Sequence, residues 1–154
     1  MGLFDSLRRR KPEPTQRPLT KNAVLISISQ SDCSDFGRVD FAAQSPDQQV
    51  FSAIWALESA VNCDGFASYF ATADDSITFA PQALDIIGAA QAASIVRRAL
   101  ELPPESSDEL TDEQLEELEV LDQAFMEYPD DLTALLYDFV AARPESFGAV
   151  PSVS

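Results

Sequence analysis

The chain has 154 residues, no histidine and a formal net charge of −16 at pH 7. The absence of imidazole excludes Ser-His-Asp and Cys-His catalytic pairs and every histidine metal ligand. With 45% apolar residues, this length is typical of one folded domain with its own core. The acidic balance predicts repulsion from nucleic acid and from anionic membranes, and attraction to basic proteins.

The charge is divided unevenly along the chain. Residues 1–22 carry six basic and two acidic side chains, whereas from Phe41 onward there are three basic and 21 acidic ones. Three prolines interrupt the N-terminal segment, and we predict a flexible basic tail there. Gly2 with Ser6 matches a short myristoylation pattern, but a tail is favoured over a membrane anchor. Apolar residues precede the basic ones, which is the wrong order for a secretory signal.

Two further features bear on location. No stretch approaches the length of a membrane span. Cys33 and Cys63 lie in no metal-binding or redox motif, and we expect them to stay free thiols. A disulfide between them is the less favoured alternative. These features predict a cytoplasmic protein.

The segment from Ala23 to Ser29 allows two interpretations. Alternation of Val24, Ile26 and Ile28 fits a short strand, whereas Val24, Leu25 and Ile28 fit the packed face of a helix.

The stretch Val50 to Phe70 is the centre of the predicted fold. Ser45 can cap its helix, and Pro46 suits the first turn. Asn62, Asp64 and Gly65 tolerate the left-handed conformation that ends a helix. The apolar residues follow three-and-four spacing, with Trp55 beside them: Val50, Phe51, Ile54, Leu57 and Val61.

This stretch resembles the signature of a bacterial family. The signature consists of a helix rich in Leu and Trp, then a Val-Asn-x-x-Gly-Phe turn, here at residues 61–66, and then a Tyr-Phe pair. Most of its members are labelled as domains of unknown function, and its best-known member is a DNA-mimic protein (the DMP-nineteen-like family). The likeness runs on through residues 83–89, 98–100 and 121–125, and covers Ser45 to Phe147. The motif residues are Trp55, Asn62, Gly65, Phe66, Tyr69 and Phe70.

This chain departs from the family turn Glu-Val-Asn-Asn-Gly-Gly-Phe at three positions. Ala60, Cys63 and Asp64 replace its Glu, second Asn and first Gly, so any role of that Glu does not carry over. Asp tolerates the left-handed region, and the turn should survive. The resemblance implies an all-α fold and favours a helix at Ala23 to Ser29.

The remaining elements follow from local signals. One helix should run from Ile77 to Ile87 and end at Gly88. The next should run from Ala89 to Leu102, with Ile95, Val96, Leu100 and Leu102 in the core, Arg97 and Arg98 at the surface, and Pro103-Pro104 ending it. Residues 105–110 read as an acidic linker. The last helix should begin near Pro129 or Asp130 and cover Leu132 to Ala142.

We therefore predict a single compact all-α domain of five to six helices at residues 23–147. The tail of residues 1–22 precedes it, and a frayed tail of residues 148–154 follows. Apolar faces on every helix are compatible with a homodimer.

An acidic helix is the second prominent feature. Thr111 and Gln114 form a capping-box pair that predicts a helix start at Asp112. Between Ala99 and Ala142 there is no Lys or Arg, so we expect no salt bridges along its face. Its buried stripe is predicted to consist of Leu115, Leu118, Leu121 and Phe125.

The charge spacing of this helix can be compared with DNA. Residues 112–127 would span roughly 24 Å, so their seven carboxylates average about one per 3.4 Å, similar to one DNA strand. A solvated acidic surface is the commoner reason for such a helix, and the family resemblance brings the two interpretations level. The predicted partner-binding carboxylates are Glu105, Asp108, Glu109, Asp112, Glu113, Glu116, Glu117, Glu119, Asp122, Glu127, Asp130 and Asp131.

The predicted function is a DNA-mimic type of protein, which binds a basic transcription factor or nucleoid protein and does not itself bind nucleic acid. One rival is an immunity-type module that neutralises a basic protein by shape and charge. The second rival is an enzyme using Asp64, Asp74, Asp75 and Tyr69, which no nucleophile or cofactor loop accompanies. We expect no catalytic residue, cofactor or metal site. The acidic pairs at 74–75, 116–117 and 130–131 lack the spacing of a calcium loop.

Overall fold

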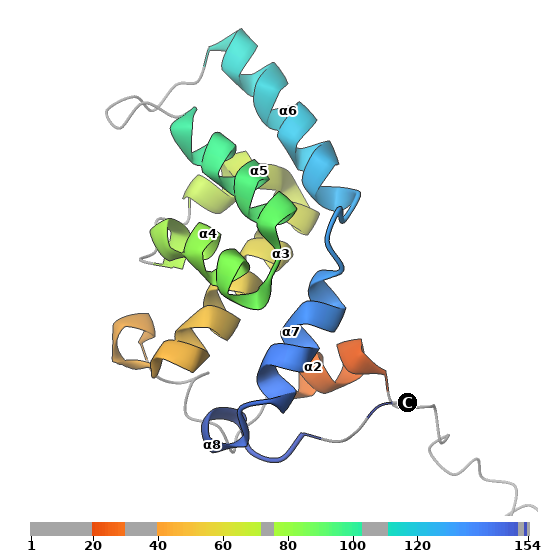
Figure 1. Cartoon of the computed structure of the whole chain (residues 1–154). Helices are drawn as coiled ribbons and strands as arrows, with labels where there is room; N and C mark the ends of the chain where they lie inside the picture. The colour runs from red at the N-terminus through yellow and green to blue at the C-terminus, as the bar shows by residue number, and fades with distance from the viewer. Residues whose placement is uncertain (1–19, 30–39, 72–75, 103–110, 151–152, 154) are drawn as a thin grey trace, which may run out of the picture.

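The structure is a computed structural model that describes residues 20–29, 40–71, 76–102, 111–150 and 153. Every regular element in these ranges is helical, which confirms the predicted all-α class (Figure 1). No described helix is long and apolar enough to cross a bilayer. The elements in chain order are α2 (Lys21–Ser29), the 3₁₀ turn η2 (Phe41–Ala43), α3 (Pro46–Ala71), α4 (Ser76–Ile87), α5 (Ala90–Glu101), α6 (Asp112–Met126), α7 (Leu132–Ala141) and α8 (Pro144–Phe147).

Helix α3 forms the centre of the core and packs against α4 and α6. The five apolar residues predicted for its stripe are all buried, and Trp55 is half-buried beside Phe51, with the two rings stacked 5.5 Å apart. The Ser45 hydroxyl accepts a hydrogen bond from the Gln48 amide, and the Gln48 side chain accepts one from the Ser45 amide. Ser45 therefore caps α3 as predicted.

A kink at Gly65 divides α3. Gly65 has φ 82° and ψ −176°, a conformation that essentially only glycine adopts. The Phe66 amide, released from the helical ladder, donates to Asp122 Oδ1 at 2.8 Å. The Phe66 ring then meets Phe125 edge-on at 5.8 Å. The predicted break at Gly65 is confirmed, and it joins the end of α3 to α6.

Helices α4 and α5 form a hairpin around Gly88, which has φ 91° as its predicted helix-ending role requires. The core face of α5 agrees with the prediction in part, because Val96 and Leu102 are buried and Ile95 and Leu100 pack against the core. Its buried residues are mainly small, because α5 packs closely on its neighbours: Ala92, Ala93, Val96 and Ala99. Ile95 and Leu100 are only half-buried.

Helices α2 and α7 pack against each other at the end of the molecule away from the start of α6 (Figure 1). Val24 and Leu25 are buried, so the helix interpretation of this segment is confirmed and the strand alternative is wrong. The short helix α8 was not predicted. Ser146 holds it to the start of α3 by donating from its hydroxyl to Asp47 at 2.8 Å.

Helix α6 begins with the predicted capping box, in which Thr111 Oγ1 accepts from the Gln114 amide and the Gln114 side chain accepts from the Thr111 amide. Leu118 and Phe125 are buried and Leu121 is half-buried, as predicted. Leu115 is 43% exposed, so its predicted burial is wrong. Near the start of α6, the inward side carries the half-buried Gln114, whose side-chain amide donates to the Leu102 carbonyl oxygen.

Replacing Thr111 with Ala should lower the free energy of unfolding by about 1 kcal/mol, because it leaves an amide at the start of α6 without its acceptor. Chemical denaturation monitored by circular dichroism measures this change. Ser94→Ala, at an exposed position within α5, is the control and should change stability by less than about 0.5 kcal/mol. Equal effects of the two substitutions would contradict the capping role.

Candidate partner-binding surface

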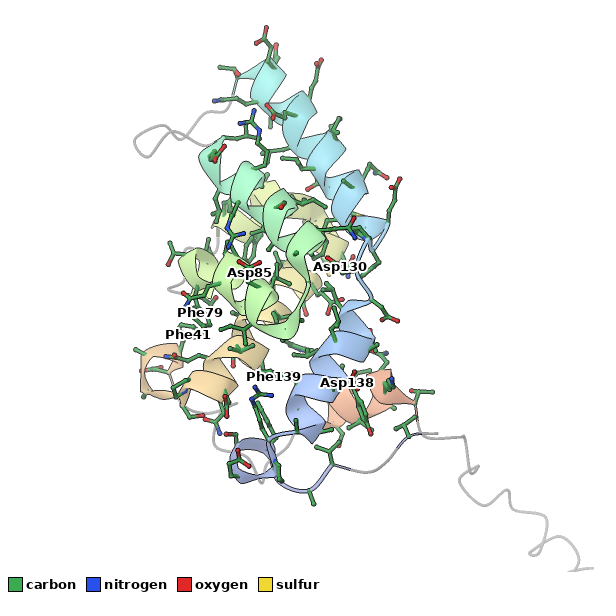
Figure 2. All side chains as sticks on the ribbon, in the orientation of Figure 1. Phe41, Phe79, Asp85, Asp130, Asp138 and Phe139 are labelled. Carbon is green, nitrogen blue, oxygen red and sulfur yellow. The ribbon has the colours of Figure 1, made fainter. Side chains whose placement is uncertain are left out.

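The outer side of α6 carries exposed carboxylates, four of them in its first half at residues 112–119 and the fifth at Glu127, just past its end. Oxygen-tipped side chains project from this helix into solvent in Figure 2. On a helical wheel, Asp112, Glu116 and Glu127 lie opposite the buried Leu118 and Phe125. We define the α6 acidic face as the exposed carboxylates Asp112, Glu113, Glu116, Glu119 and Glu127.

Four other predicted carboxylates bind groups within the molecule. Glu117 pairs with Arg98 of α5 at 2.5 Å, so the expectation of no salt bridge on α6 is wrong: the cation comes from a neighbouring helix. Asp122 accepts from the Phe66 amide. Asp130, labelled in Figure 2, accepts from the Ala92 amide at 2.8 Å and so supports the start of α5. Asp131 caps α7 by accepting from the Ala134 amide.

These internal bonds narrow the predicted site. Glu105, Asp108 and Glu109 lie outside the described residues. The α6 acidic face keeps five carboxylates over 112–127, about one per 5 Å of helix, sparser than the seven counted from sequence.

Every cation in the described part of the chain is already engaged. Arg97 pairs with Asp85, Arg98 with Glu101 and Glu117, and Arg143 with Asp47. Lys21 lies over the Tyr137 ring, 5.4 Å from its centre. Among these residues, the α6 acidic face therefore has no basic side chain that neutralises it. Its negative electrostatic potential can attract a basic partner.

Apolar side chains are interleaved with the carboxylates of α6. Leu115, Val120 and Met126 are 43%, 66% and 37% exposed. Single exposed apolar residues are common on soluble proteins, and here they add apolar contact area among the carboxylates. The combination of charge and apolar contact suits a protein partner.

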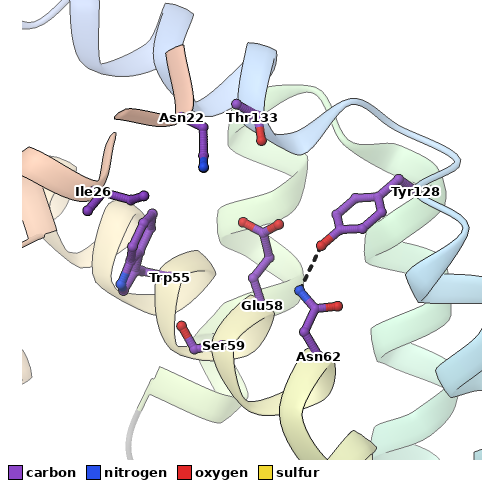
Figure 3. A pocket seen from close by; sticks show the side chains of 8 residues that line it. All are labelled: Asn22, Ile26, Trp55, Glu58, Ser59, Asn62, Tyr128 and Thr133. Carbon is purple, nitrogen blue, oxygen red and sulfur yellow. Dashed lines mark hydrogen bonds between the residues drawn. The ribbon is translucent and has the colours of Figure 1, made fainter. Parts of the chain in front are cut away.

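A pocket of about 410 Å³ lies between α2, α3 and the segment that joins α6 to α7 (Figure 3). Glu58 of α3 stands in the middle of it, between Trp55 and Tyr128. Burial raises the pKa of Glu58, and a hydrogen bond with Tyr128 opposes that rise. The Tyr128 hydroxyl also accepts from Asn62 at 2.7 Å.

Sequence reasoning assigned Trp55 and Asn62 to a structural motif and did not identify Glu58 or Tyr128. Tyr128 has φ 51°, which is a strained backbone conformation for an aromatic residue. Neither the composition nor the residue spacing around Tyr128 predicts this conformation. Only the fold brings residues 58 and 128 together.

Replacing Glu58 with Gln should raise the melting temperature near neutral pH. The folded-state pKa of Glu58 lies above its unfolded value, so the native protein loses stability as pH rises through the raised pKa. Glutamine does not titrate, and the advantage of the variant should shrink below pH about 4, where the glutamate is protonated in both states. Calorimetric scans of both proteins from acid to neutral pH measure this difference in melting temperature. An advantage that does not change with pH would contradict the burial effect.

Only two of the four residues named for the enzymatic rival lie in the described part of the chain. Asp64 and Tyr69 line an open hollow beside the exposed free thiol of Cys63, and Asp74 and Asp75 lie outside the described residues. The described residues contain no group of three or more potential metal ligands.

Fold and surface together define an acidic, all-helical protein whose exposed carboxylates gather on one helix. Residues 42–143 match the DMP19-like protein family, and the chain belongs to this family. No curated protein and no solved structure matches it. The match includes the kinked α3 and all of α6, whereas α2 and α8 lie outside it.

Proposed function

We propose that this protein binds the basic DNA-binding surface of a transcription factor or nucleoid protein through the α6 acidic face, and thereby blocks DNA binding. The observation that carries the proposal is the set of exposed carboxylates of the α6 acidic face, none of which pairs with a cation in the described part of the chain. Carboxylates here take the place of phosphates, whose charge dominates the affinity of such surfaces for DNA. The family resemblance supports the same reading.

In this proposal the protein acts by binding and not by catalysis. It requires neither cofactor nor metal, and it places the protein in the cytoplasm, where a homodimer would present two α6 acidic faces. Each carboxylate that meets a Lys or Arg of the partner competes with a DNA phosphate for that cation. Binding should therefore weaken steeply with salt.

The test is affinity capture from a lysate of the source organism, with excess duplex DNA and high salt as separate eluants. The proposal expects both to release the same basic DNA-binding protein. A matched column carrying Glu113→Gln, Glu116→Gln and Glu119→Gln should retain much less of it. A partner that duplex DNA does not displace would overturn DNA mimicry.

The exposed apolar residues favour a second candidate function. Leu115, Val120 and Met126 could pack into a partner's apolar groove, as an immunity-type protein does when it neutralises a basic toxin or enzyme. Such a complex would be released by salt only in part and by duplex DNA not at all. Val120→Ser would then weaken capture as strongly as the charge changes do.

A further inference from the structure

The pocket around Glu58 holds an acidic group that no cation in the described part of the chain neutralises. The three arginines of this part pair with other carboxylates, and Lys21 lies on the Tyr137 ring. Taking a carboxylate partly out of water without a counter-ion costs free energy. Tyr128 supplies a hydrogen bond to the Glu58 carboxylate, and no positive charge in the described part of the chain accompanies it.

The walls of the pocket suit a flat organic cation. Trp55 lies on one side of the Glu58 carboxylate and Tyr128 on the other (Figure 3). The hydroxyls of Ser59 and Thr133 add hydrogen-bond acceptors to the lining. The volume of about 410 Å³ falls within the range of ligand sites, roughly 300–1,000 Å³.

Backbone strain at Tyr128 points in the same direction. Among the described residues, Tyr128 is the one non-glycine residue with a positive φ, which is 51°. Pro129 follows it in the chain. This conformation places the phenol against Glu58 and Asn62. Strain of this kind persists where surrounding contacts enforce it, and it gathers at ligand sites.

We propose that this pocket binds a guanidinium group, with Glu58 as its counter-ion and Trp55 and Tyr128 as aromatic walls. Guanidinium is planar, stacks on aromatic rings and is more weakly hydrated than ammonium, so it fits a half-buried acidic slot better than lysine does. The group can come from an arginine in a polypeptide or from a small free guanidine. No carboxylate of the α6 acidic face lines the pocket, so the site goes beyond the proposed function.

Trp55 is the single tryptophan of the chain, and its fluorescence therefore reports directly on the pocket. The full chain is titrated with N-acetyl-arginine methylamide at low salt and pH 7.5. We expect a saturable change in emission, which Glu58→Gln weakens by about tenfold or more, since a charge-assisted hydrogen bond is lost. The control Glu116→Gln removes the same charge on α6 and should alter the affinity by less than about twofold.

The neutral isostere N-acetyl-citrulline methylamide should give no saturable change. A tripeptide Gly-Arg-Gly and free agmatine separate the two sources: equal binding shows that the guanidinium group suffices, and a preference for either identifies the source. The proposal would be overturned if the citrulline compound bound as tightly as the arginine compound. It would also be overturned if a folded Glu58→Gln variant kept the same affinity. Affinity that persists when pH falls below the raised pKa of Glu58 would overturn it too; Tyr128 is the other titratable side chain in the lining.

Discussion

Gly65→Ala is expected to lower the free energy of unfolding by about 3 kcal/mol or more, through backbone strain together with a steric clash. At φ +82°, alanine would be strained even in open space. A Cβ at this position would also lie 2.5 Å from Asp122 Oδ2 and 3.0 Å from Asp122 Cγ. Asp122 cannot move away without releasing the Phe66 amide, so the change disrupts the junction of α3 and α6.

Gly88→Ala is the matched control, because Gly88 has a similar φ of +91° but a Cβ there would meet Leu135 Cδ2 at 3.9 Å. Its cost should be the backbone strain alone, about 1–2 kcal/mol. Urea denaturation of both variants measures the difference. In the double variant Gly65→Ala, Asp122→Ala, the clash is absent and the costs should be less than additive. Equal destabilisation by the two glycine substitutions would contradict the role given to Asp122.

The triple variant Glu113→Lys, Glu116→Lys, Glu119→Lys should weaken binding of a basic partner by about a hundredfold or more at low salt. Three attractive charges on the α6 acidic face become repulsive. The fold should tolerate the change, since these side chains are exposed and the substitutions relieve repulsion between like charges on the helix. Titration calorimetry with the captured partner gives the affinity, and circular dichroism reports the fold.

A control with the same change in net charge separates local contact from general attraction. Asp64, Asp138 and Glu145 are exposed carboxylates outside α6, and their replacement by lysine should weaken binding far less. If both triple variants lose affinity equally, the attraction belongs to the whole acidic molecule, and the α6 acidic face has no special part in it.

Local chemistry made much of the fold predictable from sequence. Four such signals act over a few residues, and the structure has each of them: the Ser45 cap, the Thr111 capping box, and the helix-ending glycines at 65 and 88. Periodicity located the α3 stripe for the same reason. The periodicity gave the wrong burial for Leu115, because neighbouring helices determine which side of a helix end is buried.

The candidate site was less predictable, because its carboxylates are sorted by partners distant in sequence. Asp122 accepts a hydrogen bond from the Phe66 amide, 56 residues away in the chain, and Asp130 accepts one from the Ala92 amide, 38 residues away. Arg98 reaches Glu117 from another helix, which the absence of Lys and Arg within α6 could not reveal. The pocket at Glu58 depends on the turn at Tyr128, and sequence spacing carries no signal for that turn.

The most direct test of the central claim is competition for the partner between this protein and duplex DNA. Fluorescence anisotropy of a labelled duplex bound to the captured partner is followed as the protein is added, at several salt concentrations. Mimicry predicts that the duplex is released completely, that the triple lysine variant fails to release it, and that the protein's affinity for the partner falls steeply with salt. A duplex that stays bound while the protein joins it in a ternary complex would contradict the claim.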